Sequence, residues 1–199
     1  IYASSSSIYS DEAKKKFLEN KTKTIPKSKY GLSKIANENF ASKFSKLKDI
    51  SFIGLRFFSV YGPLGRPDMA YFSFANAIKN NQTLYLNNKG KMYRDMTYID
   101  DAIQGIVCTI KYMQQHRRTI NNEIFNIGND SPISTLKLLE TLENKLKSKA
   151  LICHVQTENE SQFTHADITK SKNLLGYEPE VCLEDGIKFF LKWFKTYEH

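Results

Sequence analysis

A tyrosine and a lysine stand four residues apart in Tyr30-Gly-Leu-Ser-Lys34, within a segment of helical pattern. This spacing places a phenol and an ammonium on one face of a helix. A phenol is a poor base near neutral pH, but a neighbouring cation stabilises its phenolate form. Such a pair can take a proton from a sugar hydroxyl, or return it, while a cofactor accepts hydride. Taken alone, the Tyr-x-x-x-Lys spacing is common enough to arise by chance.

Serines and arginines gather elsewhere along the chain. Four serines at 4–7 follow an apolar start typical of the end of a buried strand, and a loop rich in glycine and proline at 60–68 follows the apolar run 51–58. Folds of the α/β class hold ligand-binding groups at the carboxyl ends of their strands. Three arginines near shaped segments offer a rigid fork of donors suited to phosphate or carboxylate, with a structural ion pair as the alternative role: Arg56, Arg66 and Arg94.

The elements that must position these residues alternate between apolar runs of strand length and segments of helical periodicity. The predicted strands cover 51–58, 83–87, 92–99, 123–127 and 150–155, and the predicted helices cover 29–46, 69–80, 100–116, 134–147, 167–175 and 184–197. On the first helix, we expect the apolar stripe to consist of Ile35, Phe40, Phe44 and Leu47. Strands separated by helices of this length predict an α/β fold with a largely parallel sheet.

The composition limits the class of protein. The 199 residues carry 29 Lys and Arg against 21 Asp and Glu, a net charge of +8, and 41% are hydrophobic, which excludes a disordered chain. No apolar run is long enough to span a bilayer, and three widely separated cysteines fit a reduced, cytoplasmic protein. Half of the net charge lies in residues 11–29, and we interpret this basic segment as a solvated surface loop in preference to a nucleic-acid patch. With only four widely spaced histidines, we expect no metal site.

Strand-end serines, Tyr-x-x-x-Lys and Leu55-Arg-Phe-Phe-Ser-Val-Tyr-Gly-Pro63, in this order, resemble the extended short-chain dehydrogenase/reductase superfamily of NAD-dependent epimerases and dehydratases. Four stretches are especially similar to the UDP-glucuronate 4-epimerases, namely residues 2–9, 55–70, 94–101 and 125–132. The resemblance runs nearly from end to end. Within it, Gly65-Arg-Pro-Asp-Met-Ala70 favours an enzyme of the glucuronate type.

The resemblance implies a role for each matching position. Tyr30 is expected to be the catalytic acid and base, and Lys34 to stabilise its phenolate and hold the nicotinamide ribose. Ser5 is expected to bond the sugar 4-hydroxyl as the third catalytic residue, and Phe57 to contact the cofactor NAD. The expected substrate-binding residues are Ser6 and Ser7 near the C6 carboxylate, Ser59 at the sugar, Arg66, and Arg94 at the UDP phosphates.

The implied reaction interconverts UDP-glucuronate and UDP-galacturonate. Bound NAD takes hydride from C4, the 4-keto sugar rotates, and hydride returns to its other face, so that the cofactor is retained. The resemblance also implies a UDP-sugar as partner, no nucleic acid or membrane partner, and a homodimer of the full-length protein formed through the helix that carries Tyr30.

Two departures from the family pattern matter. None of the nine glycines forms G-x-G-x-x-G or G-x-x-G-x-x-G, the strand-to-helix turn that holds the NAD pyrophosphate. We therefore expect the C-terminal part of a doubly wound Rossmann-type sheet whose glycine-rich βα units are missing, with a smaller α/β substrate-binding domain. In this division, residues 1–62 are the remainder of the NAD domain, and residues 63–199 are mainly the substrate-binding region, with some segments returning to the Rossmann sheet. Residues 156–161 also replace the family's Gln-Pro-Gly-Asp, which leaves the exact sugar open.

Other interpretations stay open at this point. Another UDP-sugar 4-epimerase is one, and a nucleotide-sugar 4,6-dehydratase is a second, although a dehydratase normally carries acidic residues beside the strand-end serines, and residues 4–7 contain none. An inactive fragment and a basic nucleic-acid-binding module complete the alternatives; the latter lacks a recognised motif. We interpret Asp100 and Asp101 as helix caps, and His165 as a structural residue or part of a uridine pocket.

Overall fold

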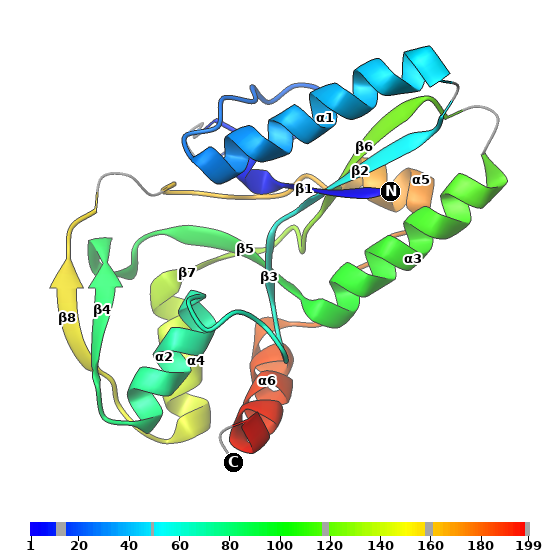
Figure 1. The fold of residues 1–199 in the computed structure, drawn as a ribbon. Helices are drawn as coiled ribbons and strands as arrows, with labels where there is room; N and C mark the ends of the chain where they lie inside the picture. Colours follow the sequence, from blue (N-terminus) through cyan, green and yellow to red (C-terminus); the bar gives the residue numbers. More distant parts are fainter. Residues whose placement is uncertain (11–14, 49, 117–119, 158–160, 198–199) are drawn as a thin grey trace.

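The computed structural model describes residues 1–10, 15–48, 50–116, 120–157 and 161–197. Its first sheet is parallel and has the strand order β1 (Tyr2–Ser5), β2 (Phe52–Phe57) and β6 (Asn122–Ile127). The four central residues of β2 are all buried, because this strand lies in the middle of the sheet with helices on both faces. Helix α1 (Lys29–Lys48) lies on one face, and α3 (Ile99–Gln115) lies on the other with α5 (Thr169–Leu175) beside it (Figure 1).

The remaining described strands form two further sheets, one of three strands and one of two. In one, β5 (Tyr93–Tyr98) pairs in parallel with β3 (Ser59–Tyr61) and antiparallel with β7 (Pro132–Ser134). In the other, β4 (Thr83–Asn87) pairs in parallel with β8 (Leu151–Val155). Helices α2 (Ala70–Lys79), α4 (Thr135–Leu146) and α6 (Leu183–Tyr197) gather beside these strands (Figure 1). Two short 3-10 helices, η1 (Ser6–Ile8) and η2 (Asn88–Gly90), complete the elements.

Two apolar clusters form the core. The first surrounds the β1-β2-β6 sheet and contains Ile53, Leu55, Phe125 and Ile127 together with Tyr177 from near the C-terminal end. The second lies among α2, α4 and α6, and its fully buried side chains include Tyr71, Leu142 and Phe190. The chain passes from the first cluster to the second after β2 and returns with α3 and β6, so neither cluster is one continuous segment. The division at residue 62 stays a prediction.

The predicted α/β class is confirmed, and each predicted helix and strand lies within two residues of an observed one. Local patterns missed β3 and β7, which have three residues each and are too short to show a period. They also predicted a largely parallel arrangement without indicating that the strands divide among three sheets or that β5 and β7 pair antiparallel.

The apolar stripe predicted for α1 is confirmed at two positions and wrong at the other two. Ile35 packs against the first cluster and the Phe44 ring contacts Phe52 of β2, whereas Phe40 is 60% exposed and Leu47 is 75% exposed. The buried positions of α1 include instead small or polar residues, among them Glu38, Ala41 and Ser45. The physical reason lies in the sheet beneath, where polar side chains face this helix and an apolar stripe would leave them without partners.

The basic segment is anchored to the rest of the fold, although only part of it lies within the described residues and Lys14 does not. The ring of Phe17 is 2% exposed, its N–H donates to the carbonyl of His165 at 2.8 Å, and its carbonyl accepts from the N–H of Asp167 at 3.1 Å. Lys16 makes an ion pair with Asp130. The segment is therefore held along one side by hydrogen bonds and burial, while all of its described lysines are exposed, as the predicted solvated surface loop requires.

Candidate active site

The serine turn begins where β1 ends. Ser5 is the N-cap of η1, and its hydroxyl accepts a hydrogen bond from the Ser7 N–H at 3.1 Å. Ser5 is buried, Ser6 is half-buried and Ser7 is exposed. Ser4, just before the cap, points into the protein and donates to Glu38 at 2.5 Å. Four residues of one type thus occupy four different environments.

The first turn of α1 lies directly against this serine turn. A Cβ atom on Gly31 would lie 2.4 Å from the Ser7 carbonyl oxygen and 2.7 Å from the Pro26 Cβ, so only glycine permits this approach. Tyr30, the neighbouring residue, is 54% exposed. The Lys34 Nζ lies 5.4 Å from the centre of the Tyr30 ring and donates to the Ala3 carbonyl at 3.2 Å. Phenol and ammonium therefore share one face of α1, as their spacing predicts.

After the serine turn and the first turn of α1, a third group of site residues comes from the end of β2 and the segment after it. Phe57 is the last residue of β2, and Ser59 begins β3. Gly62, in the loop that follows, has a φ of +143°, which favours glycine. Arg66 in the same loop donates to Asp68 from Nε at 3.0 Å and also from Nη2. This guanidinium lowers the pKa of the Asp68 carboxyl, and both side chains remain largely exposed.

The serine turn, the first turn of α1 and the segment that follows β2 together line one cavity of about 540 Å³. Seven of the eight side chains predicted from the sequence for the cofactor, the sugar or its carboxylate are among its lining residues, with Lys34 as the exception: Ser5, Ser6, Ser7, Tyr30, Phe57, Ser59 and Arg66. The lining includes no Asp or Glu among the described residues. Serine hydroxyls, a phenol and one guanidinium thus converge on a volume that a sugar can occupy.

Arg94 lies outside this cavity but borders it through Ser59. Two further cavities, of about 340 and 240 Å³, are both lined by Arg94 and Ser59, and the smaller one also contains Ser6 and Ser7. Arg94 donates to the Tyr93 carbonyl at 3.0 Å. The three cavities therefore meet at Ser59, and a ligand longer than a sugar has continuous lining from the serine turn to β5.

Sequence reasoning missed several residues of these cavities. Met69 and Tyr71 line both the sugar-sized cavity and the 340 Å³ cavity, where Tyr85 joins them. Lys27 and Thr164 line the 240 Å³ cavity. Tyr85 carried a usable signal, because it is a large aromatic residue on the exposed face of the alternating strand β4. The others lie in loops or at helix ends, where no period marks a lining position.

Arg56 does not reach a ligand cavity of the described structure. It is 4% exposed, and its guanidinium makes a bidentate pair with Glu38 through Nε at 2.9 Å and Nη2 at 2.8 Å. Its Nη1 donates to the Tyr9 hydroxyl at 2.8 Å. The structural ion pair, which we kept as the alternative role for each arginine, is the role that Arg56 has.

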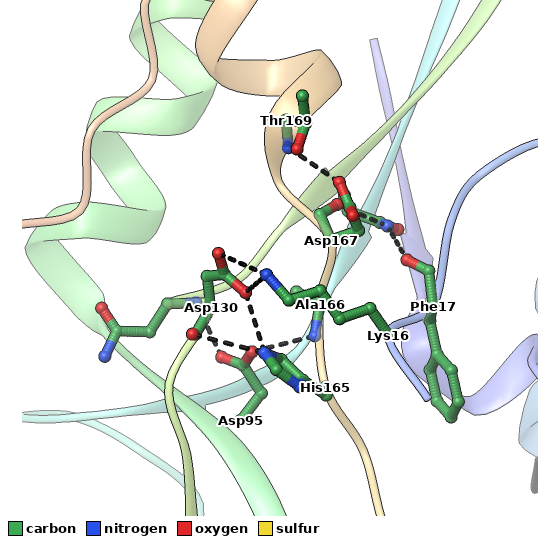
Figure 2. A network of polar contacts seen from close by, with 10 residues as sticks. Lys16, Phe17, Asp95, Asp130, His165, Ala166, Asp167 and Thr169 are labelled. Atoms are coloured by element: carbon green, nitrogen blue, oxygen red, sulfur yellow. Dashed lines mark hydrogen bonds and ion pairs between the residues drawn. The ribbon is translucent and has the colours of Figure 1, made fainter. Parts of the chain in front are cut away.

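A buried carboxylate holds the loop behind Arg94 in place (Figure 2). Asp95 is fully buried and accepts from the N–H of Asn129 at 2.7 Å and from the N–H of Ala166 at 2.9 Å. Burial raises the pKa of Asp95 to about 6, although the two N–H donors oppose the shift. Nearby, His165 contacts Asp130 at 2.8 Å (Figure 2). The carboxylate thereby joins β5 to two distant segments, and His165 has the structural role that we considered.

The start of α3 differs from the prediction that Asp100 and Asp101 cap this helix. Asp101 does not cap α3; its carboxylate accepts from the N–H groups of Glu180 and Val181, since the chain passes close to this side chain on its way to α6. The helix begins after Tyr98 without a side-chain cap. Within the described ranges there is no cluster of possible metal ligands, and no helix is both long and apolar enough to cross a membrane. Residues 158–160, inside the departure at 156–161, lie outside the described residues.

The residues present fit one end of NAD. Tyr30 and Phe57 line the cavity at its aromatic side, and the Lys34 ammonium stands beside the phenol, so a ribose and a flat ring have hydroxyl partners and an apolar surface there. For the pyrophosphate, the sequence offers no glycine-rich turn.

Comparison with known proteins agrees with this geometry. A family model described as NAD dependent epimerase/dehydratase family matches residues 1–128. The chain belongs to the NAD-dependent epimerase/dehydratase family. An uncharacterized protein of Methanocaldococcus jannaschii is 42% identical over 98% of this chain and 58% of its own length. UDP-glucuronate 4-epimerase 5 of Arabidopsis thaliana is 38% identical over 98% of this chain and 47% of its own length.

The fold is similar to solved epimerases. The crystal structure of UDP-glucuronic acid 4-epimerase from Bacillus cereus, in complex with UDP-glucuronic acid and NAD, matches with a TM-score of 0.90 and 32% identity. The match covers 98% of this chain and 60% of that one. The chain thus spans about half to three fifths of the length of these relatives.

Proposed function

We propose that the protein is a UDP-glucuronate 4-epimerase, which interconverts UDP-glucuronate and UDP-galacturonate through a 4-keto sugar. The observation that carries the proposal is the single cavity in which Tyr30, the serine turn, Ser59 and Arg66 meet. The similarity to UDP-glucuronate 4-epimerases supports the choice of substrate. The lack of Asp or Glu among the described lining residues supports epimerisation over 4,6-dehydration.

Proton transfer at the sugar 4-oxygen is the task of Tyr30. Its phenolate accepts the proton of the 4-hydroxyl, and the phenol so formed later returns it. The Lys34 ammonium stabilises the phenolate that is present before the first transfer and again after the second. The Ser5 hydroxyl accepts from the Ser7 N–H, and its own proton, which is donated to the Ser7 Oγ at 3.2 Å, turns to the same sugar oxygen and orients it when the substrate binds. NAD, when bound beside Tyr30 and Phe57, supplies reversible acceptance of hydride at C4.

The C6 carboxylate needs donors or positive charge, and the cavity offers both. Ser6, Ser7 and Ser59 present hydroxyls, and Arg66 presents the guanidinium. Arg94, in the two adjoining cavities, lies beyond Ser59 and takes the diphosphate. In this arrangement, residues 1–62 supply the catalytic groups, and residues 63–199 supply most of the nucleotide contacts.

We also propose that the full-length protein forms a homodimer through α1. Three large apolar side chains on this helix are more than half exposed, which is costly for a surface that meets only water: Leu32, Phe40 and Leu47.

The test uses the full-length protein, supplied with NAD and UDP-glucuronate, and follows UDP-galacturonate by proton NMR. We expect conversion, and we expect Tyr30→Phe to lower the rate by about 10²- to 10⁴-fold because one proton-transfer group is lost. UDP-glucuronate binding should stay within about twofold, since the ring remains. The matched control is Tyr112→Phe on α3, whose ring packs against Phe125 away from the cavity. Conversion of UDP-glucose alone would favour another 4-epimerase, and a 4-keto-6-deoxy product would favour a dehydratase.

A further inference from the structure

A row of buried polar side chains crosses the β1-β2-β6 sheet beneath α1. Ser4 lies directly opposite Arg56 in the pairing of β1 with β2, and Arg56 lies directly opposite Asn126 in the pairing of β2 with β6. Their exposed fractions are 2%, 4% and 0%. Polar groups buried in this way are costly unless each finds a partner. The row therefore demands partners from the elements packed on this face of the sheet.

Glu38 of α1 is the partner at one end of the row. Its Oε1 accepts from Ser4 at 2.5 Å and from the Arg56 Nε at 2.9 Å, and its Oε2 accepts from the Arg56 Nη2 at 2.8 Å. Two parallel bonds from a planar guanidinium fix both the distance and the orientation of the carboxylate. Glu38 itself is 9% exposed, so water does not compete strongly for these bonds.

The row continues on the other side of Arg56. The Arg56 Nη1 donates to the Tyr9 hydroxyl, which in turn donates to the Asn126 Oδ1 at 2.7 Å. Burial raises the pKa of Tyr9, so its phenol keeps the proton that it donates. The Asn126 amide then donates to the Phe17 carbonyl at 2.6 Å. Every member of the row is thus satisfied, and the arginine is held from both sides.

The position of Glu38 on α1 gives this network a consequence for the site. Tyr30, Lys34 and Glu38 follow one another at intervals of four residues, so they lie along one stripe of the helix. Eight residues separate Glu38 from Tyr30, which is about 12 Å of helix. Apolar packing near this stripe is limited to partly buried side chains such as Ile35, because the fully buried residues nearby are small or polar, as Ala41 and Ser45 are.

We propose that Glu38 and Arg56 are positioning residues. They fix the position of α1 along its own axis and its rotation about that axis, so that Tyr30 and Lys34 face Ser5 at the cavity. The two partners of Glu38 each directly precede a residue of the cavity lining in the sequence: Ser4 precedes Ser5, and Arg56 precedes Phe57. A helix freed from this pair can shift along the sheet, and a displacement of about 1 Å at a reacting group costs about 100-fold in rate. The consequence for catalysis rests on the function proposed above, whereas the geometric claim does not.

The experiment compares two conservative variants with a control. Glu38→Gln keeps the shape of the side chain and loses its charge, and Arg56→Lys keeps the charge and loses the fork. The control is Lys170→Met, which breaks the ion pair between Lys170 and Glu123 on the same sheet, away from the strand ends that carry the serine turn. If Arg56→Lys fails to fold, Glu38→Gln carries the test.

The first readout needs no substrate. In protein labelled with carbon-13 at the tyrosine ζ position, we expect the Tyr30 resonance to move or split in both variants and to stay unchanged in Lys170→Met. An unchanged Tyr30 resonance in both folded variants would overturn the proposal. If the wild-type protein converts no UDP-sugar while the Tyr30 resonance still moves, the proposed function fails and the positioning role stands.

The second readout is kinetic. At a temperature well below unfolding, we expect kcat to fall by at least about tenfold in both variants while the Kd for UDP-glucuronate changes less than about twofold. A loss of stability alone would lower the apparent kcat through the amount of folded protein, so kcat is expressed per mole of protein that binds UDP-glucuronate in the titration that gives Kd. Variants with the kcat of Lys170→Met contradict the proposal.

Discussion

The four serines at 4–7 show how far the surroundings of a residue decide its role. Ser4 is buried against Glu38, Ser5 caps a 3-10 helix, and Ser6 and Ser7 turn progressively toward solvent and line the cavity. The side chains are identical, so sequence alone ranks none of them above the others. Their distinction comes from the end of β1, where the chain stops alternating between faces and turns.

Arg66 is the residue on which substrate choice should depend most visibly. Arg66 lines the cavity, and its guanidinium is oriented by the ion pair with Asp68. Removal of a donor to a charged group costs about 1.5–3 kcal/mol, which is about 10- to 150-fold. We therefore expect Arg66→Ala to lower kcat/KM for UDP-glucuronate by this factor and that for UDP-glucose much less. Equal losses on both substrates would mean that Arg66 holds the shared nucleotide or the loop.

Asp95 predicts a pH dependence of stability. Its pKa is about 6 in the folded protein, above the unfolded value of about 3.9, so the folded state holds the proton more tightly. Between these values the unfolded state has lost the proton first, and stability falls as the pH rises from about 4 to about 6. A difference of about 2 pKa units corresponds to roughly 3 kcal/mol.

The measurement compares wild type with Asp95→Asn, which cannot titrate at this position. The free energy of unfolding in urea, taken from pH 4 to 6.5, should fall for wild type relative to the variant across that range. All other ionisable groups are common to the two proteins, so the difference isolates Asp95. A difference that is independent of pH would show that the carboxyl titrates as it does in the unfolded chain.

At the scale of elements, the site depends on how α1 meets the serine turn and the sheet. The contact at its first turn is made by backbone against backbone, through Gly31 and the Ser7 carbonyl. One turn further, Lys34 reaches the Ala3 carbonyl, and beyond it Glu38 reaches Arg56. These polar contacts at successive turns add to the apolar contacts of Ile35 and Phe44, which cover only part of the face that usually docks a helix. Such contacts are directional, which suits a helix that carries a proton-transfer group.

Gly31→Ala tests the first of these contacts. Alanine is the better helix former by about 1 kcal/mol, yet its Cβ would lie 2.4 Å from the Ser7 oxygen. We expect the clash to prevail and to lower the free energy of unfolding by about 1–3 kcal/mol, as overpacking does. The contrast is Gly105→Ala on α3, where the nearest atom is a side-chain methyl of Ile127 at 3.0 Å and can move. If Gly31→Ala stabilises the protein, the close approach of α1 does not exist in solution.

At the scale of the whole molecule, the cavities form where the two apolar clusters meet. Tyr30 and the serine turn belong to the layer of the β1-β2-β6 sheet, whereas Met69, Tyr71 and Tyr85 come from the layer of α2 and β4. A ligand that spans the cavities therefore contacts both layers. Sites between two packed units are common for ligands of this length.

This arrangement predicts an order of affinities for the 199-residue chain. The residues around Ser59 and Arg94 can hold a UDP-sugar along its length, but for NAD the sequence offers only the ribose and nicotinamide contacts. We expect calorimetry to detect UDP-glucuronate binding, and NAD binding to be much weaker or undetectable. The matched variant Arg94→Ala should weaken binding of the UDP-sugar and leave any binding of NAD unchanged. Tight, stoichiometric NAD binding would contradict the prediction.

The sequence by itself determined the kinds of element and the catalytic candidates. Helical and strand periods arise from contacts within a few residues, so local pattern predicted every α-helix of the described residues and, after residue 50, all but the shortest strands. The pairing of Tyr30 with Lys34 on one face follows from helix geometry alone. Motif order then identified the family, because the residue types that a shared chemistry requires recur at fixed places along the chain.

Tertiary structure alone decided which residues meet. Arg56 and Arg66 both have the chemistry of a ligand-binding residue. Arg56 is paired with Glu38 in the protein interior, whereas Arg66 lines the cavity. The direction of α1, with Phe40 outward and Glu38 inward, follows from the polar row on a sheet whose strands come from residues 2–5, 52–57 and 122–127. Strand register and burial depend on contacts between segments far apart in the chain. The periodicity within one segment therefore does not indicate which other segment will pack against it.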